Sequence, residues 1–339
     1  MIIGVDARPL SHPATGIGRY TDCLLQEMTR RGHEWRLFSS APFASACLQL
    51  PNVRARTGRI DTASPRSLYH SQWSFGRWAK EEKIDLFWSP RHHLPIALPA
   101  SLPCVVTIHD VVWKRYPQTM RWPNRVTEQL LMPRAVRRAQ RLICVSRFTA
   151  REVSHFWPGA ESRSSVVYSG APRQEPADGP GTQGRYFLFV GTAEPRKNLT
   201  RLLHAFAAFS SDDPQQRRLV IVGDNGWGAI DLRSEIERLG ITSIVDLYGR
   251  VDDAELHKYY ANAECLLLPS LYEGCGLPVI EAMQYGVPAL VAERGAPAEM
   301  AGDACLTCDP ASVKSIAGAL AAWADGAELR RALREQARE

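Results

Sequence analysis

Residues 264–283 read ECLLLPSLYEGCGLPVIEAM, and they join a short apolar run to a glycine-containing turn and a helical pattern. The run 265–268 is uninterrupted and bounded by proline and serine, which is typical of a strand buried in a parallel sheet. Gly274 and Gly276 let a ligand approach the backbone closely, and Pro278 suits the first turn of a helix. The stretch predicts a strand, a turn and a helix, the repeating unit of an open α/β sheet.

Two glutamates, Glu273 and Glu281, stand at either end of this turn. The backbone amides from Gly274 to Leu277 can point at an anion where the helix begins. A carboxylate does not bind a phosphate, so the glutamates are candidates for accepting hydrogen bonds from hydroxyl groups beside it, a sugar on one side and a ribose on the other. The alternative is an ordinary corner with two solvated glutamates.

The length of 339 residues suits two domains of roughly 150 residues each. Hydrophobic content of 45% and charged content of 23% are those of a soluble globular protein. No apolar run is long enough to span a membrane, and residues 1–6 have the pattern of a strand rather than of a signal peptide, so we expect a cytoplasmic protein. The eight cysteines are scattered and are expected to be free thiols; the Cys305 and Cys308 pair lacks the partners of a metal site.

Short apolar strands alternate with helical patterns along the whole chain. In the first half we expect strands at 2–5, 35–38, 85–88, 104–108, 142–145 and 165–168, and helices after Gly18 and around 70–82, 123–139 and 147–156. Residues 41–66 show no clear period and suggest an irregular excursion. In the second half we expect strands at 186–190, 219–222, 244–248, 264–268 and 287–291, and helices at 199–209, 231–239, 252–262, 278–285 and 312–324.

Residues 173–184 are almost all proline, glycine and polar residues, which predicts a linker. The chain is therefore expected to form two Rossmann-like, doubly wound parallel-sheet domains, at 1–172 and 185–339. Ligands of such sheets bind at the carboxyl ends of the strands, so a cleft between the two domains is the expected site.

The sequence GTAEPRKN at 191–198 follows the first strand of the second domain. Asn198 is expected to cap the next helix, and the charges of Arg196 and Lys197 at its mouth can meet a diphosphate. A pair of ordinary surface cations is the alternative. The strand ends at Gly223-Asp224 and from Gly249 to Val251 are candidate walls for a flat nucleobase.

In the first domain, Gly16 and Gly18 offer backbone amides at the start of a helix. Thr21 stands where a dinucleotide-binding loop carries its third glycine, which disfavours a nicotinamide dehydrogenase. The chain also lacks the lysine and serine or threonine of a P-loop, which disfavours a kinase or ATPase. The loop remains a candidate for binding a phosphorylated ligand.

His109 and Asp110 close the strand 104–108. The histidine can hydrogen-bond a reacting sugar or shuttle a proton, with Asp110 or a backbone carbonyl fixing its tautomer; a structural histidine is the alternative. His92 and His93 stand at another strand end and are candidates for the acceptor side. No cluster of acidic residues and histidines suits a divalent metal, so we expect no cofactor and expect cations and amides to meet the charge of a leaving diphosphate.

Residues 114–141 carry eight lysines and arginines against the single acidic residue Glu128, and aromatic residues are interleaved here and at 73–78. Such a surface fits an anionic membrane, where each basic side chain contributes about 1 kcal/mol. It equally fits nucleic acid, or a solvated helix face whose aromatic side chains point into the core.

The motif Glu273 to Pro278 continuing to Glu281, together with 194–198, 16–18 and His109-Asp110, resembles the retaining GT-B glycosyltransferases of family four. The resemblance spans nearly the whole chain. It implies that Glu273 lies by the donor sugar and Glu281 holds the ribose of a nucleotide-sugar. It implies further that His109 approaches the sugar near its reacting carbon, and that the diphosphate is held by Gly274, Cys275, Gly276, Leu277 and Lys197.

Two positions depart from that family. Many members carry an arginine where Thr192 stands, and Arg196 is the candidate to replace its phosphate contact. Many carry phenylalanine where Cys275 stands, which is tolerable where the backbone amide makes the contact.

The sequences near the amino terminus and at 194–198 are similar to those of bacterial mannosyl- and deoxyhexosyltransferases of surface polysaccharide (O-antigen) synthesis. This resemblance implies a metal-independent hexosyltransferase that uses GDP-mannose or GDP-rhamnose and extends a lipid-linked glycan at the cytoplasmic face of the inner membrane, where the basic stretch 114–141 would bind. A UDP-sugar donor, a nucleotide-sugar epimerase and an inactive nucleotide-sugar-binding protein are the alternatives. Nucleic acid is not an expected partner, because no recognition motif accompanies the basic stretch.

Overall fold

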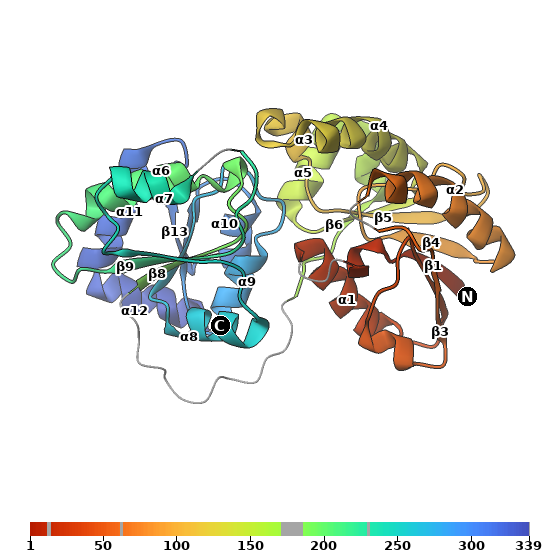
Figure 1. The fold of residues 1–339 in the computed structure, drawn as a ribbon, viewed down its shortest axis with the longest axis horizontal. Coiled ribbons are helices and arrows are strands. Elements are labelled where there is room, and N and C mark those ends of the chain that lie inside the picture. The colour runs from red at the N-terminus through yellow and green to blue at the C-terminus, as the bar shows by residue number, and fades with distance from the viewer. Residues whose placement is uncertain (12–14, 62–63, 171–185, 229–230, 339) are drawn as a thin grey trace. The chain divides into compact units, whose positions relative to one another are not determined.

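The computed structural model describes residues 1–11, 15–61, 64–170, 186–228 and 231–338 (Figure 1). The predicted linker at 173–184 lies outside the described residues. The chain divides into two compact units, one made of Met1–Val111 with Trp122–Ser169 and the other of Val112–Arg121 with Gly170–Glu339. Each unit has its own parallel sheet.

In the described residues, the first unit holds a seven-stranded parallel sheet of order β3-β2-β1-β4-β5-β6-β7. Its strands are β1 Ile2–Asp6, β2 Glu34–Ser39, β3 Val53–Thr57, β4 Leu86–Ser89, β5 Cys104–Ile108, β6 Arg141–Cys144 and β7 Ser164–Val166. The α-helices between them are α1 Gly16–Met28, α2 Pro65–Glu81, α4 Trp122–Arg138 and α5 Arg147–Phe156, with α3 Val112–Arg115 assigned to the other unit.

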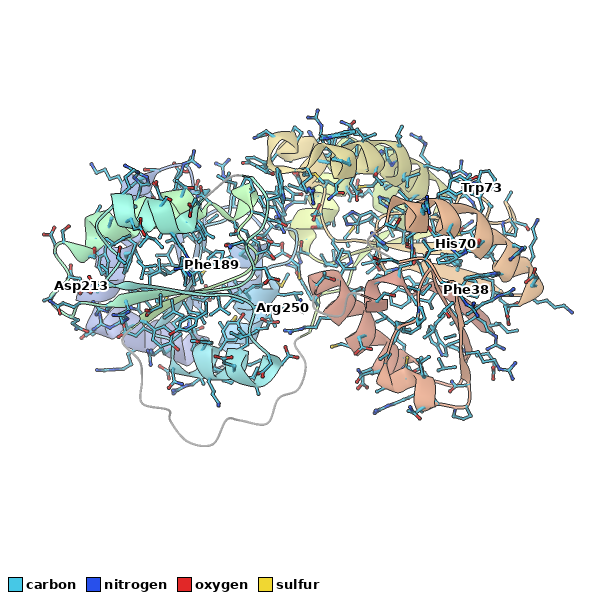
Figure 2. The ribbon with its side chains drawn as sticks, in the orientation of Figure 1. Phe38, His70, Trp73, Phe189, Asp213 and Arg250 are labelled. Atoms are coloured by element: carbon cyan, nitrogen blue, oxygen red, sulfur yellow. The ribbon has the colours of Figure 1, made fainter. Side chains whose placement is uncertain are left out.

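Helix α1 covers one face of this sheet, and α2 and α4 cover the other (Figure 1). The interior is aromatic: the Phe38 ring lies 5.8 Å from that of Phe75 and 5.7 Å from that of Trp78, and all three are buried. Figure 2 shows Phe38 inside the unit and Trp73 at its outer edge. Aromatic side chains of this size bury large apolar areas, so they fix α2 against the sheet.

The irregular excursion expected at 41–66 is wrong in part, because it contains the edge strand β3. Only Val53 of this strand is buried, and the others are polar or partly exposed. An edge strand pairs on one side only and needs no continuous apolar run, so its sequence lacks the signal of a central strand.

In the described residues, the second unit holds a six-stranded parallel sheet of order β10-β9-β8-β11-β12-β13. Its strands are β8 Tyr186–Val190, β9 Arg218–Val222, β10 Val245–Tyr248, β11 Cys265–Leu268, β12 Ala289–Ala292 and β13 Cys305–Cys308. Its helices are α6 Leu199–Ser210, α7 Leu232–Arg238, α8 Asp253–Asn262, α9 Leu277–Met283, α10 Ala296–Ala301, α11 Val313–Asp325 and α12 Ala327–Gln336.

One buried cluster fills the second unit, with Phe187, Phe189, Phe206 and Trp323 among its members. Phe189 lies within it in Figure 2. Helices α6, α7 and α11 cover one face of the sheet, and α8 and α9 cover the other (Figure 1). The predicted doubly wound fold is confirmed for each unit.

The chain leaves β8 toward β9 and β10 and returns across the sheet to β11, so its winding reverses between β8 and β11. Ligands of open α/β sheets bind outside the strand ends at such a switch point. The turns after β8 and β11 meet there, since the Leu271 amide donates to the Arg196 carbonyl at 2.8 Å. The fold thereby joins the two motifs that the sequence marked.

All eight cysteines lie in described ranges and are free thiols, as predicted. None of the described helices combines the length and the hydropathy that a membrane-spanning helix requires.

Candidate functional site

A buried ion cluster lies at the switch point of the second unit. The Glu273 carboxylate, 9% exposed, receives Arg196 Nη1 at 3.0 Å on Oε2, and Lys197 Nζ contacts Oε1. The Ser270 hydroxyl donates to Oε1 at 3.2 Å. Glu194 holds the other side of Arg196, with 2.9 Å between Nε and Oε2. Two cations and two carboxylates thus form one locally neutral group.

Electrostatics in this cluster keep the carboxylate charged. Burial alone would raise the pKa of Glu273, but the charges and hydrogen bonds of Arg196 and Lys197 outweigh it and hold that pKa at about 2. Burial lowers the pKa of Lys197, and Glu273 offsets this only in part. The charged form of a buried amine beside one carboxylate is stabilised further when a second anion binds. The cluster is therefore suited to an anionic ligand.

Asn198 does not cap α6 with its side chain, so that prediction is wrong. The residue has a left-handed backbone, with φ 65°, and its Nδ2 donates to the carbonyls of Pro269 at 2.9 Å and Pro310 at 2.7 Å. Asparagine tolerates this backbone conformation better than most residues. Its amide therefore joins the turn after β8 to the turns after β11 and β13.

Gly276 precedes α9 with φ 87°, a left-handed conformation. A Cβ there would lie 3.1 Å from the Pro297 Cα. The position therefore needs glycine for its backbone and for space. The buried Gly274 and the half-buried Cys275 complete the turn, and Leu277 begins the helix.

Glu281 lies on α9 and is 9% exposed. The Tyr260 hydroxyl donates to its Oε2 at 2.7 Å, and the Tyr260 ring stacks on Tyr285. Tyr260 was not predicted, because a tyrosine in a helix gives no sequence signal for a polar role. Its hydrogen bond fixes the carboxylate that the sequence assigns to a ribose.

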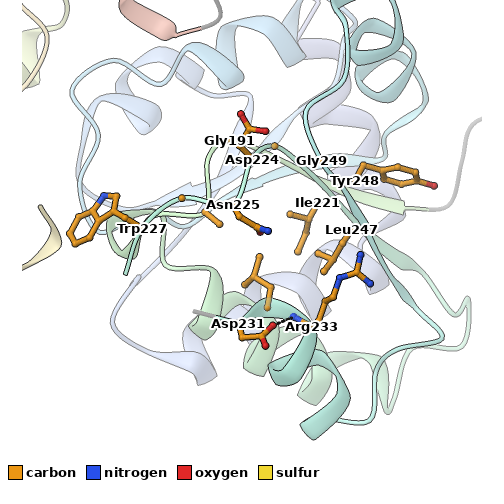
Figure 3. Close-up of a pocket in the computed structure, with 14 residues that line it drawn as sticks. Gly191, Ile221, Asp224, Asn225, Trp227, Asp231, Arg233, Leu247, Tyr248 and Gly249 are labelled. Carbon is orange, nitrogen blue, oxygen red and sulfur yellow. Dashed lines mark hydrogen bonds between the residues drawn. The ribbon is translucent and has the colours of Figure 1, made fainter. Parts of the chain in front are cut away.

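A pocket of about 570 Å³ opens at the ends of β8, β9 and β10 (Figure 3). The predicted wall residues Gly223, Asp224 and Gly249 line it, whereas Val251 packs against the hydrophobic core instead. The other lining residues are Gly191, Ala193, Ile221, Asn225, Gly226, Trp227, Asp231, Leu232, Arg233, Leu247 and Tyr248.

The pocket lies next to the ion cluster. A Cβ placed on Gly191, which lines the pocket, would lie 3.7 Å from Lys197 Nζ. Asp231 is occupied as the cap of α7, accepting from the amides of Arg233 and Ser234. A ligand with a flat ring in the pocket could therefore extend its phosphates to the cations.

His109 follows β5 in the first unit, as predicted, and its tautomer is fixed by a backbone carbonyl. Its Nε2 lies 2.8 Å from the Pro90 carbonyl oxygen, which can only accept, so Nε2 carries the hydrogen. The Tyr20 ring packs edge-on at 4.9 Å. Burial, with the electrostatic effects of His92 and Arg91, lowers the pKa of His109 to about 3, so the ring is neutral.

Gly16 and Gly18 do not form a loop before the helix, because α1 begins at Gly16. The Gly18 amide donates to the Thr15 hydroxyl at 3.1 Å, so Thr15 is the helix cap. The Gly18 amide is therefore bonded to Thr15 in this structure, and the contact of Gly16 and Gly18 with a ligand stays a prediction. The threonine directly before Gly-Ile-Gly could have been recognised as the cap.

The basic stretch 114–141 is only partly available as a surface. Arg134 donates to the Ile96 carbonyl and Arg138 to the carbonyls of Pro99 and Leu102, so both have structural roles. Of the interleaved aromatics, Phe75, Trp78 and Trp113 are buried, while Trp73 is 53% and Trp122 is 76% exposed. The predicted basic aromatic surface is thus smaller than the sequence suggested.

The structure brings together Arg196, Lys197 and Glu273 beside the pocket in the second unit, with Glu281 on α9. The candidates Gly16, Gly18, His109 and Asp110 lie in the first unit. Glu194 and Ser270 were missed as cluster members, although each lies within three residues of a predicted site residue. Among the described residues, no three His, Cys, Asp or Glu side chains converge as a metal site would require.

Two doubly wound parallel-sheet units in one chain, with a pocket at the strand ends of the second, fit the GT-B architecture. Residues 172–339 match the family model of "Glycosyl transferases group 1", and residues 14–175 match that of "Glycosyltransferase Family 4". The chain therefore belongs to the GT-B glycosyltransferases, with a family 4 domain followed by a group 1 domain.

Relatives and solved structures agree with this assignment. The chain is 28% identical to the O-antigen chain mannosyltransferase B of Escherichia coli, over 91% of this chain and 86% of the relative. It is 24% identical to the O-antigen chain mannosyltransferase RfbU of Salmonella typhimurium, over 81% and 75%. The structure of WaaG, a glycosyltransferase involved in lipopolysaccharide biosynthesis, superposes with a TM-score of 0.76 at 18% identity, covering 100% of this chain and 94% of WaaG.

Proposed function

We propose that the protein transfers mannose, or a deoxymannose such as rhamnose, from a GDP-sugar to a hydroxyl of a lipid-linked glycan in bacterial surface polysaccharide synthesis. The names of its relatives support the sugar and the pathway, because both relatives described above are O-antigen mannosyltransferases. The chain covers most of the length of both relatives, so the similarity includes both domains.

The observation that carries the proposal is the ion cluster of Arg196, Lys197 and Glu273 beside the pocket. A diphosphate that reaches the two cations would displace the carboxylate from them. Glu273 would then be available to accept hydrogen bonds from the donor sugar, which is the role that the sequence resemblance implies. Arg196 would supply the phosphate contact that Thr192 cannot make.

The proposed reaction is a front-face displacement with retention. The bond between the sugar C1 and the diphosphate oxygen breaks, and the acceptor oxygen bonds to C1 from the same face. The acceptor proton passes to the departing diphosphate. Arg196, Lys197 and the amides of Gly274 to Leu277 stabilise the charge that develops on the leaving group. Glu273 orients the sugar and forms no covalent bond to it.

The pocket also bears on the donor base. Asp224 and Arg233 are among its lining residues, together with the apolar Ile221 and Leu247. Guanine offers N–H donors on one edge and the acceptors O6 and N7 on another, which complement a carboxylate and an arginine. A uracil ring has no amino group to offer Asp224, so the lining favours GDP over UDP.

A donor screen tests the proposal. GDP and GDP-mannose should raise the midpoint of thermal unfolding more than UDP and UDP-glucose at equal concentration, because a ligand that binds only the native state stabilises it. Asp224→Asn should reduce the difference between GDP and UDP. Equal stabilisation by both nucleotides would reject the guanine assignment, and NMR of the product anomeric carbon would decide between retention and inversion.

We propose that turnover requires no metal, since two protein cations are positioned for the diphosphate. Activity should be unchanged after treatment with EDTA. Restoration of a lost activity by Mg²⁺ or Mn²⁺ would reject this part of the proposal.

We also propose that the protein binds the cytoplasmic membrane surface through one face of α4, where the lipid-linked acceptor would lie. Trp122, Val126 and Leu130 are 76%, 42% and 69% exposed and recur every four residues, so they share one helix face. Exposed Arg121 and Arg125 flank this face. Apolar side chains with adjacent arginines suit an anionic lipid surface.

Vesicle flotation tests the membrane surface. The protein should float with vesicles containing phosphatidylglycerol and less with phosphatidylcholine alone, and Trp122→Ala with Leu130→Ala should reduce binding severalfold. Tyr168→Ala is the matched control, because Tyr168 is 45% exposed in the same unit but is not part of α4. Equal binding by all variants would reject this surface.

A further inference from the structure

A buried cluster on the inner side of α4 has no part in the reaction described above. The Glu128 carboxylate lies between two histidines, with Oε2 3.3 Å from His92 Nδ1 and Oε1 3.1 Å from His93 Nε2. Both histidines are buried, at 7% and 3% exposure. Glu128 is the one acidic residue within the basic stretch 114–141, and it is also turned inward, away from the face of Trp122 and Leu130.

Hydrogen positions in this cluster follow from the partners of each ring. The backbone N–H of His109 donates to His92 Nε2 at 3.0 Å, so that nitrogen carries no hydrogen. His92 Nδ1 must then carry the hydrogen, and it points to the Glu128 carboxylate, which accepts. A chain of contacts therefore runs from α4 through His92 to the backbone of His109.

His109 itself is held at two points. Its backbone N–H is bound by His92, and its ring Nε2–H is bound by the Pro90 carbonyl. The remaining ring nitrogen, Nδ1, is an acceptor in this tautomer. A neutral acceptor in a fixed position can receive a hydrogen bond from a sugar hydroxyl, whereas it cannot donate a proton to the reaction.

We propose that Glu128 and His92 are positioning residues for His109, and that His109 acts through Nδ1 as a fixed hydrogen-bond acceptor rather than as a proton shuttle. The inference rests on the proposed function for the role of His109 toward the sugar. The hydrogen bonds that fix His109 lie within the first unit, so their effect can be measured without any substrate.

Opposing effects act on the pKa of His92, and they make its hydrogen bond to the His109 backbone N–H sensitive to pH. Burial disfavours its charged form, but the facing carboxylates of Glu128 and Asp110 outweigh burial and the charge of Arg91 and raise the pKa of His92. His93 and His109 are the other titratable rings packed against it. When His92 gains a proton at Nε2, it can no longer accept the His109 N–H. Acidification should therefore release His109 as the pH falls through the raised pKa.

The test compares two substitutions at His92. His92→Gln keeps an acceptor near the position of Nε2, whereas His92→Asn is too short to reach it. We expect His92→Asn and Glu128→Ala to lower kcat at least tenfold with little change in the KM for the donor, and His92→Gln to retain most of kcat. The acid limb of the kcat profile should be absent in His92→Gln. Gln129→Ala, an exposed neighbour on α4, is the control for changes in the helix.

A spectroscopic measurement separates this inference from the proposed function. In ¹⁵N-labelled protein without substrate, His109 should show the Nε2–H tautomer, and Glu128→Ala should broaden or shift its imidazole signals while Gln129→Ala does not. Unchanged imidazole signals together with unchanged kcat in both Glu128→Ala and His92→Asn would overturn the proposal. Changed signals in a protein that transfers no sugar would preserve the positioning and reject the function.

Discussion

Lys197 is the residue whose removal should separate binding from folding most clearly. Its buried ammonium contacts Glu273, and it is the proposed partner of the diphosphate. Lys197→Ala should lower kcat/KM at least a hundredfold and weaken GDP binding, since a charge-assisted contact to the leaving group is lost. Lys258→Ala, an exposed lysine on α8, is the control. Wild-type turnover in Lys197→Ala would refute the phosphate assignment.

His109 should show no titration in the range where the enzyme works. Its pKa is lowered to about 3 by burial and neighbouring positive charge, so the ring stays neutral from pH 5 to 8. Its NMR chemical shifts should be independent of protonation of its own ring in that range. A full titration step of the His109 ring near pH 6.5 would contradict the buried, neutral state.

Glu273 should make stability depend on pH in a defined window. Its pKa in the folded protein is about 2, below the ordinary value of 4.5, so its charged form contributes stability above pH 4.5 that is lost as the pH falls toward 2. Denaturant titrations of Glu273→Gln should lose this part of the acid dependence. A variant with the same slope as the wild type between pH 4.5 and 2 would show that the ion cluster does not stabilise the fold.

At this scale the sequence identified the charged members of the site but not their contacts. Lys197, Arg196 and Glu273 are recognisable because glycine and proline punctuate their turns. The capping role assigned to Asn198 failed because its backbone is left-handed, a conformation set by the meeting of two distant turns. Partners that are distant along the chain, such as Tyr260 and Glu281, leave no local pattern to read.

The turn before α9 depends on Gly276. Gly276→Ala should destabilise the second unit by roughly 1–2 kcal/mol, because a Cβ is unfavourable in the left-handed conformation, and the close Pro297 Cα adds to this. Gly318→Ala is a matched control in α11, where a Cβ meets nothing within 4 Å; there alanine should stabilise by about 0.5–1 kcal/mol. Thermal unfolding measures both, and equal effects would contradict the turn geometry.

The central strands were predictable, and the edge strands were predictable only in part. Strands such as β8 and β11 are continuous apolar runs because helices cover both faces of the sheet. The edge strands β7 and β10 were predicted, whereas the edge strands β3 and β13 were missed, since most of their residues are polar or partly exposed. Helix α4 was predicted, but the separation of its inner face from its exposed face depends on burial that periodicity alone did not reveal.

For the whole molecule, nucleotide should stabilise one unit selectively. The pocket and the ion cluster both belong to the second unit, so GDP at 100 times its Kd should stabilise that unit by about 2.7 kcal/mol. Hydrogen exchange should slow at the ends of β8, β9 and β10 and remain unchanged in β1 to β3. Protection confined to the first unit would contradict the assignment of the donor half-site.

The division into two similar α/β domains was predictable, because the alternation of strands and helices stops at a stretch without an apolar period and then restarts. The assignment of Val112–Arg121 to the second unit was not predictable. That segment stands between β5 and α4 in the chain, both of which belong to the first unit. Its position in the sequence gives no reason to expect it in the second unit.

The carboxylate of Glu273 is a counterion that the protein itself supplies to Arg196 and Lys197. Because it is tethered within contact of Lys197 and Arg196, it competes with every free anion at a high effective concentration. Chloride and inorganic phosphate would therefore inhibit weakly. Neither ion fills the adjacent pocket, so neither makes contacts that offset the loss of the Glu273 ion pairs. In the proposed cycle the same side chain returns to the cations as the nucleoside diphosphate departs, so the residue that orients the substrate also speeds the release of the product.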